Sequence, residues 1–498
     1  MVAFPARFNA AADLIDGNLE LGRGAEPAIR SRERDLSYQE LGGEANQSAN
    51  AMLELGVRRG ERVLFALDDS PELIAGFLGA IRIGAIPIAA NPGADARELA
   101  YLVNDSGARM AVVGEAVAAR LRPYSELCRQ LRRVAVLGAP EEPEVDWAKV
   151  VGEAPREART AATRPDDACF WVYTVGSSGI PHAAVHRHRD MRVCVEQWAR
   201  PVLGLGPSDS VFSAAKLSSS YGLGNSLFHP LGTGATTVLM AEPPAPPLVF
   251  DVVRKYRPTV FFAVPTGYAN SLAWTGADFS SVRVCVSAGE PLGGSLLQRW
   301  RARMGVEIIE VYGSTELAHA TISNAIGRSR PGSPGRLVAG CQARIVDDSG
   351  GDLPEGDTGR LLIRSDASSR SYWRRPALSR RTFLGEWTAT GDLFRRDGAG
   401  YYYFEGRADD MLKVGGQWVS PAQVEGVLRR HDWVRACAVS GLVDEDRLIR
   451  LQAHLVLRPG SGDPAETTLQ IRRRLRSELP AYKWPRDLHF VKTLPRPG

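Results

Sequence analysis

Apolar runs that predict buried strands alternate with amphipathic helical segments in the first part of the chain. Residues 37–40 form a capping box that opens a helix, and the apolar run at 63–67 predicts a short strand. Ser70 then provides an N-cap for a second helix, and residues 85–90 predict another strand. This alternation indicates a parallel sheet with covering helices.

The same alternation returns farther along the chain, with a helix predicted at 248–256 and strands at 259–264 and 282–286. After Pro334, turn-forming clusters separate short strands, which indicates a small β-barrel-like piece. We therefore predict an α/β fold with a large N-terminal domain of parallel sheets and a barrel-like subdomain.

Helix and strand patterns resume near residue 408 and predict a small α+β C-terminal domain. We place the boundary in the segment 406–410, which divides the chain into domains 1–406 and 407–498. A length of 498 residues agrees with two or more domains.

Composition and charge argue against several classes of function for this protein. A formal net charge of +4 over 498 residues gives no basis for a nucleic-acid interface. The 6 cysteines are scattered and none forms a Cys-x-x-Cys pair, so neither a zinc site nor a disulfide framework is expected. The most apolar segment, 73–90, is too short and interrupted to span a bilayer, and no secretory signal opens the chain. These features predict a reduced, cytoplasmic setting.

A buried strand at 169–173 breaks into a loop of hydroxyl-bearing residues and glycines. Such a loop brings hydroxyls and backbone N–H groups close to a ligand and suits phosphate oxygens, although it also suits a plain connection. No Gly-Lys-Ser/Thr follows, so it is not a Walker A loop. The candidate phosphate donors are Thr174, Gly176, Ser177, Ser178 and Gly179.

Further motifs follow in a fixed order along the chain. They are Val-Tyr-Gly-Ser-Thr-Glu at 311–316, Thr-Gly-Asp at 390–392, Gly-Arg-Ala-Asp-Asp-Met-Leu-Lys-Val-Gly-Gly at 406–416 and Pro-Ala-Tyr-Lys-Trp-Pro-Arg at 480–486. In this order and spacing the chain resembles the adenylate-forming superfamily, which includes acyl-CoA synthetases, firefly luciferase and peptide-synthetase adenylation domains. The resemblance covers nearly the whole chain.

The resemblance implies an ATP site. Glu316 offers a hard carboxylate oxygen for Mg²⁺, which commonly takes one or two protein carboxylates plus phosphates, although an acid there also suits a helix N-terminus. Thr315 is expected to meet the α-phosphate, and Asp392 the ribose hydroxyls with Arg407 nearby. The remaining ATP-binding candidates are His182, the adenine wall Ser287, Ala288, Gly289, Glu290 and Pro291, and the segment Tyr312, Gly313 and Ser314.

The implied mechanism has two half-reactions. A substrate carboxylate, already ionised near neutral pH, attacks the α-phosphate and pyrophosphate leaves. A thiol then attacks the acyl-adenylate after the C-terminal domain rotates about a hinge, matched here by Asp409. Lys413, Gly415 and Gly416 would line the CoA thiol tunnel, where a narrow channel leaves no room for Cβ atoms, although Gly-Gly also makes a plain hairpin turn.

Some positions depart from the family pattern. Val175 stands where a serine is usual, and His182 replaces the lysine of the phosphate loop, which weakens the expected phosphate contacts. Residues 494–498 resemble the start of the final motif, whose Gly-Lys pair would follow. Either a mobile tail is missing from the sequence or the enzyme is naturally truncated, and we expect the former.

The stretch 214–225 resembles the benzoate-CoA ligase branch, which includes 2-aminobenzoate-CoA ligases. The resemblance implies an enzyme that activates a benzoate-type acid with ATP and transfers it to CoA, as a monomer or homodimer. A stand-alone enzyme that loads a carrier-protein phosphopantetheine and a catalytically weak ligand-binding relative are the alternatives. The implied aryl pocket comprises Ser220, Tyr221, Gly222, Gly313, His319 and Ala320.

Overall fold

The computed structural model describes residues 2–175, 179–410, 412–414, 417–443, 449–460, 463–479 and 481–494. The chain forms two compact units. The first comprises Met1–Ala343, Leu362–Thr390 and Ala399–Tyr402, and the second comprises Arg344–Leu361, Gly391–Gly398 and Tyr403–Gly498. The division into domains 1–406 and 407–498 stays a prediction.

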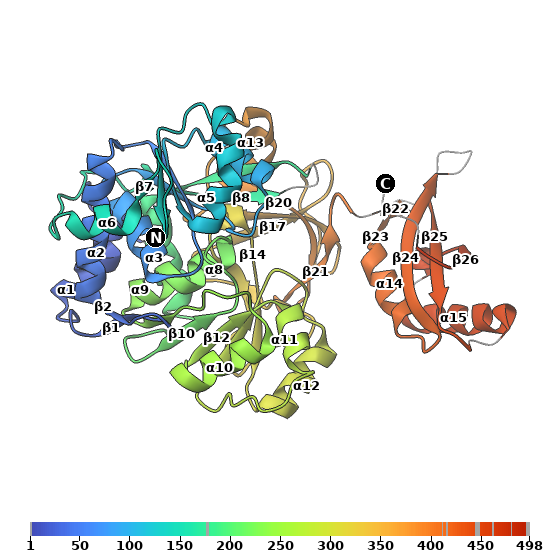
Figure 1. The fold of residues 1–498 in the computed structure, drawn as a ribbon. Coiled ribbons are helices and arrows are strands. Elements are labelled where there is room, and N and C mark those ends of the chain that lie inside the picture. The colour runs from blue at the N-terminus through green and yellow to red at the C-terminus, as the bar shows by residue number, and fades with distance from the viewer. Residues whose placement is uncertain are drawn as a thin grey trace. The chain divides into compact units, whose positions relative to one another are not determined.

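A nine-stranded sheet forms one half of the first unit (Figure 1). Strands β1, β10, β11, β12, β13 and β14 are parallel to their neighbours in this set, as the helix–strand alternation predicted. In order across the sheet, the strands are β16 (Arg336–Leu337), β15 (Ala320–Ser323), β14 (Ile308–Gly313), β13 (Val284–Ser287), β12 (Val260–Ala263), β10 (Ser210–Ser213), β11 (Thr236–Val238), β1 (Pro27–Arg30) and β2 (Leu36–Ser37).

Side chains of this sheet alternate between two apolar clusters, because successive strand residues point to opposite faces. Phe261 and Ala263 pack with the buried faces of α10 (Pro246–Tyr256), α11 (Pro265–Ser271) and α12 (Gly294–Met304). Val260 and Phe262 pack on the other face with Trp198. The sheet is therefore buried on both sides, and ligands can reach it only at its edges or strand ends.

A seven-stranded sheet forms the other half of this unit, and only its β8–β9 pair is antiparallel. Phe65 of this sheet packs in one apolar cluster with α2 (Tyr38–Glu54) and α3 (Pro71–Arg82). Leu64 packs in another with α4 (Ala96–Ser106) and α5 (Glu115–Leu121). In order, the strands are β7 (Val145–Asp146), β6 (Arg133–Leu137), β5 (Met110–Gly114), β3 (Arg62–Ala66), β4 (Ile86–Ala89), β8 (Ala168–Val175) and β9 (Pro181–Arg187).

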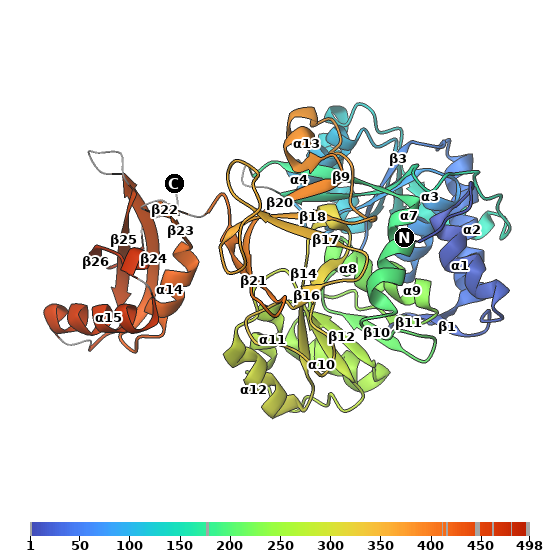
Figure 2. The same cartoon turned by 180° about the vertical axis from the view of Figure 1, so that it is seen from behind.

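The two predicted helix starts are confirmed. The Ser37 side chain accepts a hydrogen bond from Glu40 N, and the Glu40 carboxylate accepts one from Ser37 N. In the second helix, the Ser70 side chain accepts from Leu73 N. These caps satisfy backbone donors that the first helical turn leaves without partners. The helices of this unit outside the α10–α12 group are α1 (Ala10–Glu20), α2 (Tyr38–Glu54), α3 (Pro71–Arg82), α4 (Ala96–Ser106), α5 (Glu115–Leu121), α6 (Trp147–Glu153), α7 (His188–Cys194), α8 (Ser220–Leu223), α9 (His229–Thr233) and α13 (Pro376–Thr382); Figure 2 shows α1 and α2 from behind.

The piece predicted after Pro334 is a five-stranded sheet. Its order is β17 (Gln342–Val346), β18 (Gly359–Arg364), β20 (Trp387–Arg396) and β19 (Phe383–Leu384), with β21 (Tyr402–Arg407) beside β20.

The C-terminal part folds as α+β around its own apolar core. Antiparallel β24 (Val434–Val443) and β25 (Ile449–Leu457) and parallel β26 (Asp487–Phe490) form a sheet, and β22 (Leu412–Val414) pairs with β23 (Gln417–Val419). The helices are α14 (Pro421–Arg429) and α15 (Pro464–Glu478). Across the described residues of both units, every helix is too short or too polar to cross a bilayer.

Candidate active site

The carboxyl ends of β13 and β14 place two predicted segments side by side. These strands are parallel neighbours, so the residues that follow them emerge at the same edge of the sheet. Ser287 ends β13, and its buried hydroxyl has no hydrogen-bond partner among the described residues. Ala288 is buried as well, whereas Gly289, Glu290 and Pro291 are exposed. Tyr312 lies half-buried at the end of β14, so the predicted adenine wall and the predicted aromatic face share one edge.

Gly313 is required by a close approach of the backbone. A Cβ atom at this position would lie 2.4 Å from the His319 carbonyl oxygen, well inside van der Waals contact. Antiparallel pairing of β14 with β15 sets Gly313 opposite Ala320. The Tyr-Gly motif and the predicted aryl-pocket residues His319 and Ala320 are thereby brought together.

Residues 315–317 form a single 3-10 turn and no longer helix begins there. The Glu316 carbonyl accepts a hydrogen bond of 2.7 Å from Ser369 N, and Ala318 closes the turn with a φ of 63°, a strained value for a non-glycine residue. The Glu316 side chain is half-buried and accepts a 2.7 Å hydrogen bond from the Tyr372 hydroxyl at Oε1. Glu316 therefore does lie in the first turn of a helix that begins after Ser314, but this helix is only three residues long.

Tyr372 is a functional candidate that the sequence did not indicate. It is 7% exposed, and its ring meets the ring of His182 edge-on with centroids 4.6 Å apart. One tyrosine thus contacts both the predicted cation ligand Glu316 and the predicted phosphate-loop residue. No motif surrounds Tyr372, so only the fold could reveal it.

The structure describes the two ends of the predicted phosphate loop. Thr174 lies near the end of β8 and pairs with His182 on β9, and Gly179 is exposed with a φ of 71°. His182 is buried, with Nδ1 3.1 Å from the Ile180 carbonyl oxygen. Its contact with phosphate stays a prediction. Gly176, Ser177 and Ser178 lie outside the described residues.

The predicted aryl-pocket residues of α8 lie beside the 3-10 turn. Ser219 caps this helix, and the Ser220 hydroxyl lies 3.2 Å from the Thr315 hydroxyl. The Tyr221 hydroxyl donates to the Val286 carbonyl at 3.0 Å. A Cβ atom at Gly222 would lie 2.0 Å from the Lys216 carbonyl oxygen, so the chain's own backbone requires this glycine whatever binds nearby.

His319 adds a neutral surface to this group. Burial lowers the pKa of the His319 ring to about 4, so the imidazole is uncharged near neutral pH. Its Nε2 lies 3.4 Å from the Ser365 hydroxyl, and Ala320 beside it is buried. Uncharged, largely buried surroundings of this kind suit an apolar ring.

In the second unit, the Arg407 guanidinium donates to Asp392 Oδ1 at 3.0 Å. The turn is closed by a 2.8 Å hydrogen bond from Ala408 N to the Gly391 carbonyl. The predicted proximity of Asp392 and Arg407 is confirmed, and their contact with ribose stays a prediction. Asp409 is exposed directly after this turn, Lys413 lies on β22, and Gly415 and Gly416 fall outside the described residues. The hinge and CoA-tunnel roles remain predictions.

The donor set fits a magnesium ion that the nucleotide would bring. Among the described residues, no three or more His, Cys, Asp or Glu side chains come together as a metal site. A single carboxylate such as Glu316 is enough for Mg²⁺ that takes most of its other oxygens from phosphates and water. Glu316 fits this requirement, and its role as the cation ligand stays a prediction.

Comparison with known proteins agrees with this geometry. Residues 21–373 match the AMP-binding enzyme family, and residues 423–498 match the AMP-binding enzyme C-terminal domain. The chain belongs to the AMP-binding enzyme family. The resemblance inferred from the motifs is thus confirmed. The first match includes the nine-stranded and seven-stranded sheets, and the second lies in the C-terminal α+β part.

Several members of the AMP-binding enzyme family are similar to this chain over nearly its full length. A benzoate–CoA ligase of Thauera aromatica is 40% identical, over 99% of this chain and 94% of that protein. An anthranilate–CoA ligase of Pseudomonas aeruginosa is 35% identical, over 88% of this chain and 85% of that protein. The crystal structure of the anthranilate CoA ligase AuaEII in complex with anthranoyl-AMP superposes with a TM-score of 0.89 and 36% identity, covering 99% of this chain and 95% of that one.

Proposed function

We propose that this chain is an AMP-forming aryl-CoA ligase that activates a benzoate-type acid with ATP and transfers the aroyl group to CoA. The relatives named benzoate– and anthranilate–CoA ligase support this function, because the similarity extends over nearly the whole chain. The observation that carries it is the 3.2 Å approach of the Ser220 and Thr315 hydroxyls. A carboxylate beside Ser220 would lie next to the α-phosphate beside Thr315.

The first half-reaction requires positioning more than proton transfer. A carboxylate oxygen of the acid attacks the α-phosphorus, and the bond to pyrophosphate breaks. Thr315 would donate its hydroxyl hydrogen to an α-phosphate oxygen, and Glu316 would hold Mg²⁺. The cation supplies charge neutralisation when it is bound with the nucleotide. An uncharged His319 would leave the ring pocket without a cation to compete for the carboxylate of the acid.

The second half-reaction forms the thioester. The CoA sulfur attacks the aroyl carbon of the adenylate, the bond to AMP breaks, and the thiol proton passes to solvent. Asp409 would act as the hinge between the two half-reactions, and Lys413, Gly415 and Gly416 would line the path of the thiol.

ATP–pyrophosphate exchange with a panel of benzoates tests the proposal. We expect exchange that depends on an aromatic acid with benzoate, 2-aminobenzoate or a hydroxybenzoate, and little exchange with short aliphatic acids. Mass spectrometry of the product with free CoA or with a phosphopantetheine-bearing carrier protein then identifies the acceptor. Exchange that no benzoate stimulates would refute the aryl assignment, and thioester formed only on the carrier protein would refute CoA as the acceptor.

A further inference from the structure

A fully buried histidine lies directly beneath the Thr315–Glu316 turn. His186, near the end of β9, is 0% exposed and stacks on Phe170 with ring centroids 4.9 Å apart. Its Nε2 lies 2.8 Å from the Thr315 carbonyl oxygen. A carbonyl oxygen only accepts, so Nε2 carries the hydrogen and donates it. This contact joins residues 129 positions apart in the chain.

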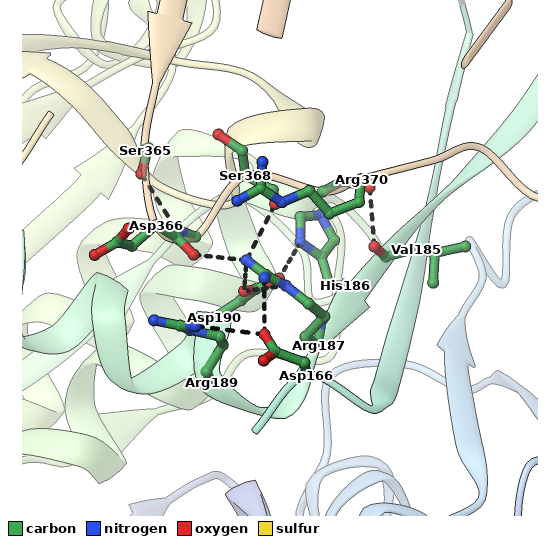
Figure 3. Close-up of polar contacts among 12 residues, drawn as sticks. Asp166, Val185, His186, Arg187, Arg189, Asp190, Ser365, Asp366, Ser368 and Arg370 are labelled. Atoms are coloured by element: carbon green, nitrogen blue, oxygen red, sulfur yellow. Dashed lines mark hydrogen bonds and ion pairs between the residues drawn. The ribbon is translucent and has the colours of Figure 1, made fainter. Parts of the chain in front are cut away.

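The other ring nitrogen is held by a buried carboxylate (Figure 3). His186 Nδ1 lies 3.2 Å from Asp190 Oδ2, and Asp190 is 0% exposed. Both ring nitrogens face acceptors, so a hydrogen bond at each requires a hydrogen on both, and the imidazolium form pairs with the Asp190 carboxylate. The two contacts together fix the orientation of the ring. A ring held at one nitrogen presents the other in a defined direction, as in histidines that are oriented by a carboxylate.

The same carboxylate holds a second cationic side chain. Asp190 Oδ1 accepts from Arg187 Nε at 3.1 Å, and Arg187 Nη2 donates to the Asp366 carbonyl oxygen at 2.6 Å (Figure 3). Asp366 lies in the same loop as Ser369, whose N–H donates a hydrogen bond to the Glu316 carbonyl. The Asp190 carboxylate thus contacts two side chains. His186 reaches the Thr315 carbonyl, and Arg187 reaches the loop whose Ser369 N–H binds the Glu316 carbonyl.

We propose that His186, oriented by Asp190, is a positioning residue for adenylation, because its Nε2–H fixes the carbonyl of Thr315 and so the turn that presents the Thr315 hydroxyl and the Glu316 carboxylate. The inference rests on the proposed function for the roles of these two side chains. His186 itself touches neither the nucleotide nor the acid. It acts by holding the backbone of the turn, whose strained Ala318 would otherwise allow the turn to relax.

Two amide substitutions separate the contacts of His186. In His186→Gln the amide nitrogen reaches about as far as Nε2 and can still donate to Thr315. In His186→Asn the amide reaches only as far as Nδ1, keeps the Asp190 side and loses Thr315. His188→Asn is the matched control, because His188 is also 0% exposed but its Nδ1 accepts from Ala10 N, away from the turn.

The measurements are calorimetric binding of ATP with and without Mg²⁺, pyrophosphate exchange, and thioester formation from supplied benzoyl-adenylate and CoA. We expect His186→Asn to weaken ATP binding in Mg²⁺ at least tenfold and to lower kcat of exchange at least tenfold. His186→Gln and His188→Asn should stay within about threefold of the parent. Thioester formation from supplied adenylate should change less than threefold in all three variants.

Equal losses in His186→Asn and His186→Gln, or losses in His188→Asn as large as in His186→Asn, would overturn the positioning role. So would a His186→Asn variant with parental ATP binding in Mg²⁺. A parent that binds ATP but exchanges pyrophosphate with no benzoate would refute the proposed function. In that case the calorimetric comparison of the variants still decides the role of His186.

Discussion

The buried carboxyl group of Glu310 provides a test of the structure through the pH dependence of stability. Glu310 lies on β14, is 7% exposed, and accepts a 3.0 Å hydrogen bond from Leu292 N at Oε1. Leu292 directly follows the predicted adenine wall at 287–291. Burial raises the pKa of Glu310 from 4.5 to about 7. Glu310→Gln keeps the size and the acceptor oxygen but cannot lose a proton.

The sign of this pH dependence follows from the number of protons that the folded and unfolded states bind. Between pH 4.5 and about 7 the folded protein retains a proton on Glu310 that the unfolded chain has released. The free energy of unfolding therefore falls as pH rises through this interval and is constant, as far as Glu310 is concerned, above it. One pKa unit corresponds to about 1.4 kcal/mol, so the loss reaches roughly 3 kcal/mol. Glu310→Gln should show no such loss.

Urea unfolding of the first unit at pH 5 and pH 8 measures the effect. The free energy of unfolding of Glu310→Gln minus that of the parent should be roughly 2–3 kcal/mol larger at pH 8 than at pH 5. Asp69, whose pKa burial raises to about 6, titrates in both proteins and cancels in this difference. Glu54, exposed at the end of α2, gives the control variant Glu54→Gln, which should gain nothing. A difference between Glu310→Gln and the parent that is the same at both pH values would refute the reasoning.

Three further substitutions test the site. Glu316→Gln should keep the fold and lower pyrophosphate exchange at least a hundredfold, because several kcal/mol of charge stabilisation depend on the cation; near-parental exchange would contradict the assignment. Asp409→Pro, which holds φ near −65°, should leave exchange intact and strongly lower thioester formation, whereas equal loss in both half-reactions would argue against a hinge. Ala320→Ile should lower kcat/KM for 2-aminobenzoate about tenfold more than for benzoate by filling space beside the ring, and an unchanged ratio would show that Ala320 does not border it.

The Ser220 hydroxyl shows how tertiary contacts change an interpretation. The resemblance to benzoate-CoA ligases implies that Ser220 lines the aryl pocket. In the fold this hydroxyl lies 3.2 Å from the Thr315 hydroxyl, 95 positions away. Ser220 therefore contacts the residue that is predicted to meet the α-phosphate.

Local features of this protein follow from the sequence alone. Helix starts at Ser37 and Ser70 depend on hydrogen bonds within one turn, and buried strands depend on the side-chain period of neighbouring residues, so both are visible along the chain. The ordered motifs likewise predict the family, the ATP site and the aryl acid. The family resemblance carried by these motifs also implies the proximity of Asp392 and Arg407, which the structure confirms.

Only the tertiary structure decided the contacts that hold the turn at residues 315–317, where the catalytic residues are predicted. Tyr372 reaches Glu316 from a loop 56 positions away, and His186 reaches Thr315 from β9. A hydrophobic pattern determines which face of each element is buried, but it does not determine which distant loop lies beside that element once the sheets have formed. Hydrogen bonds between such loops depend on sheet order and strand ends, which arise from packing the whole first unit rather than from any one segment.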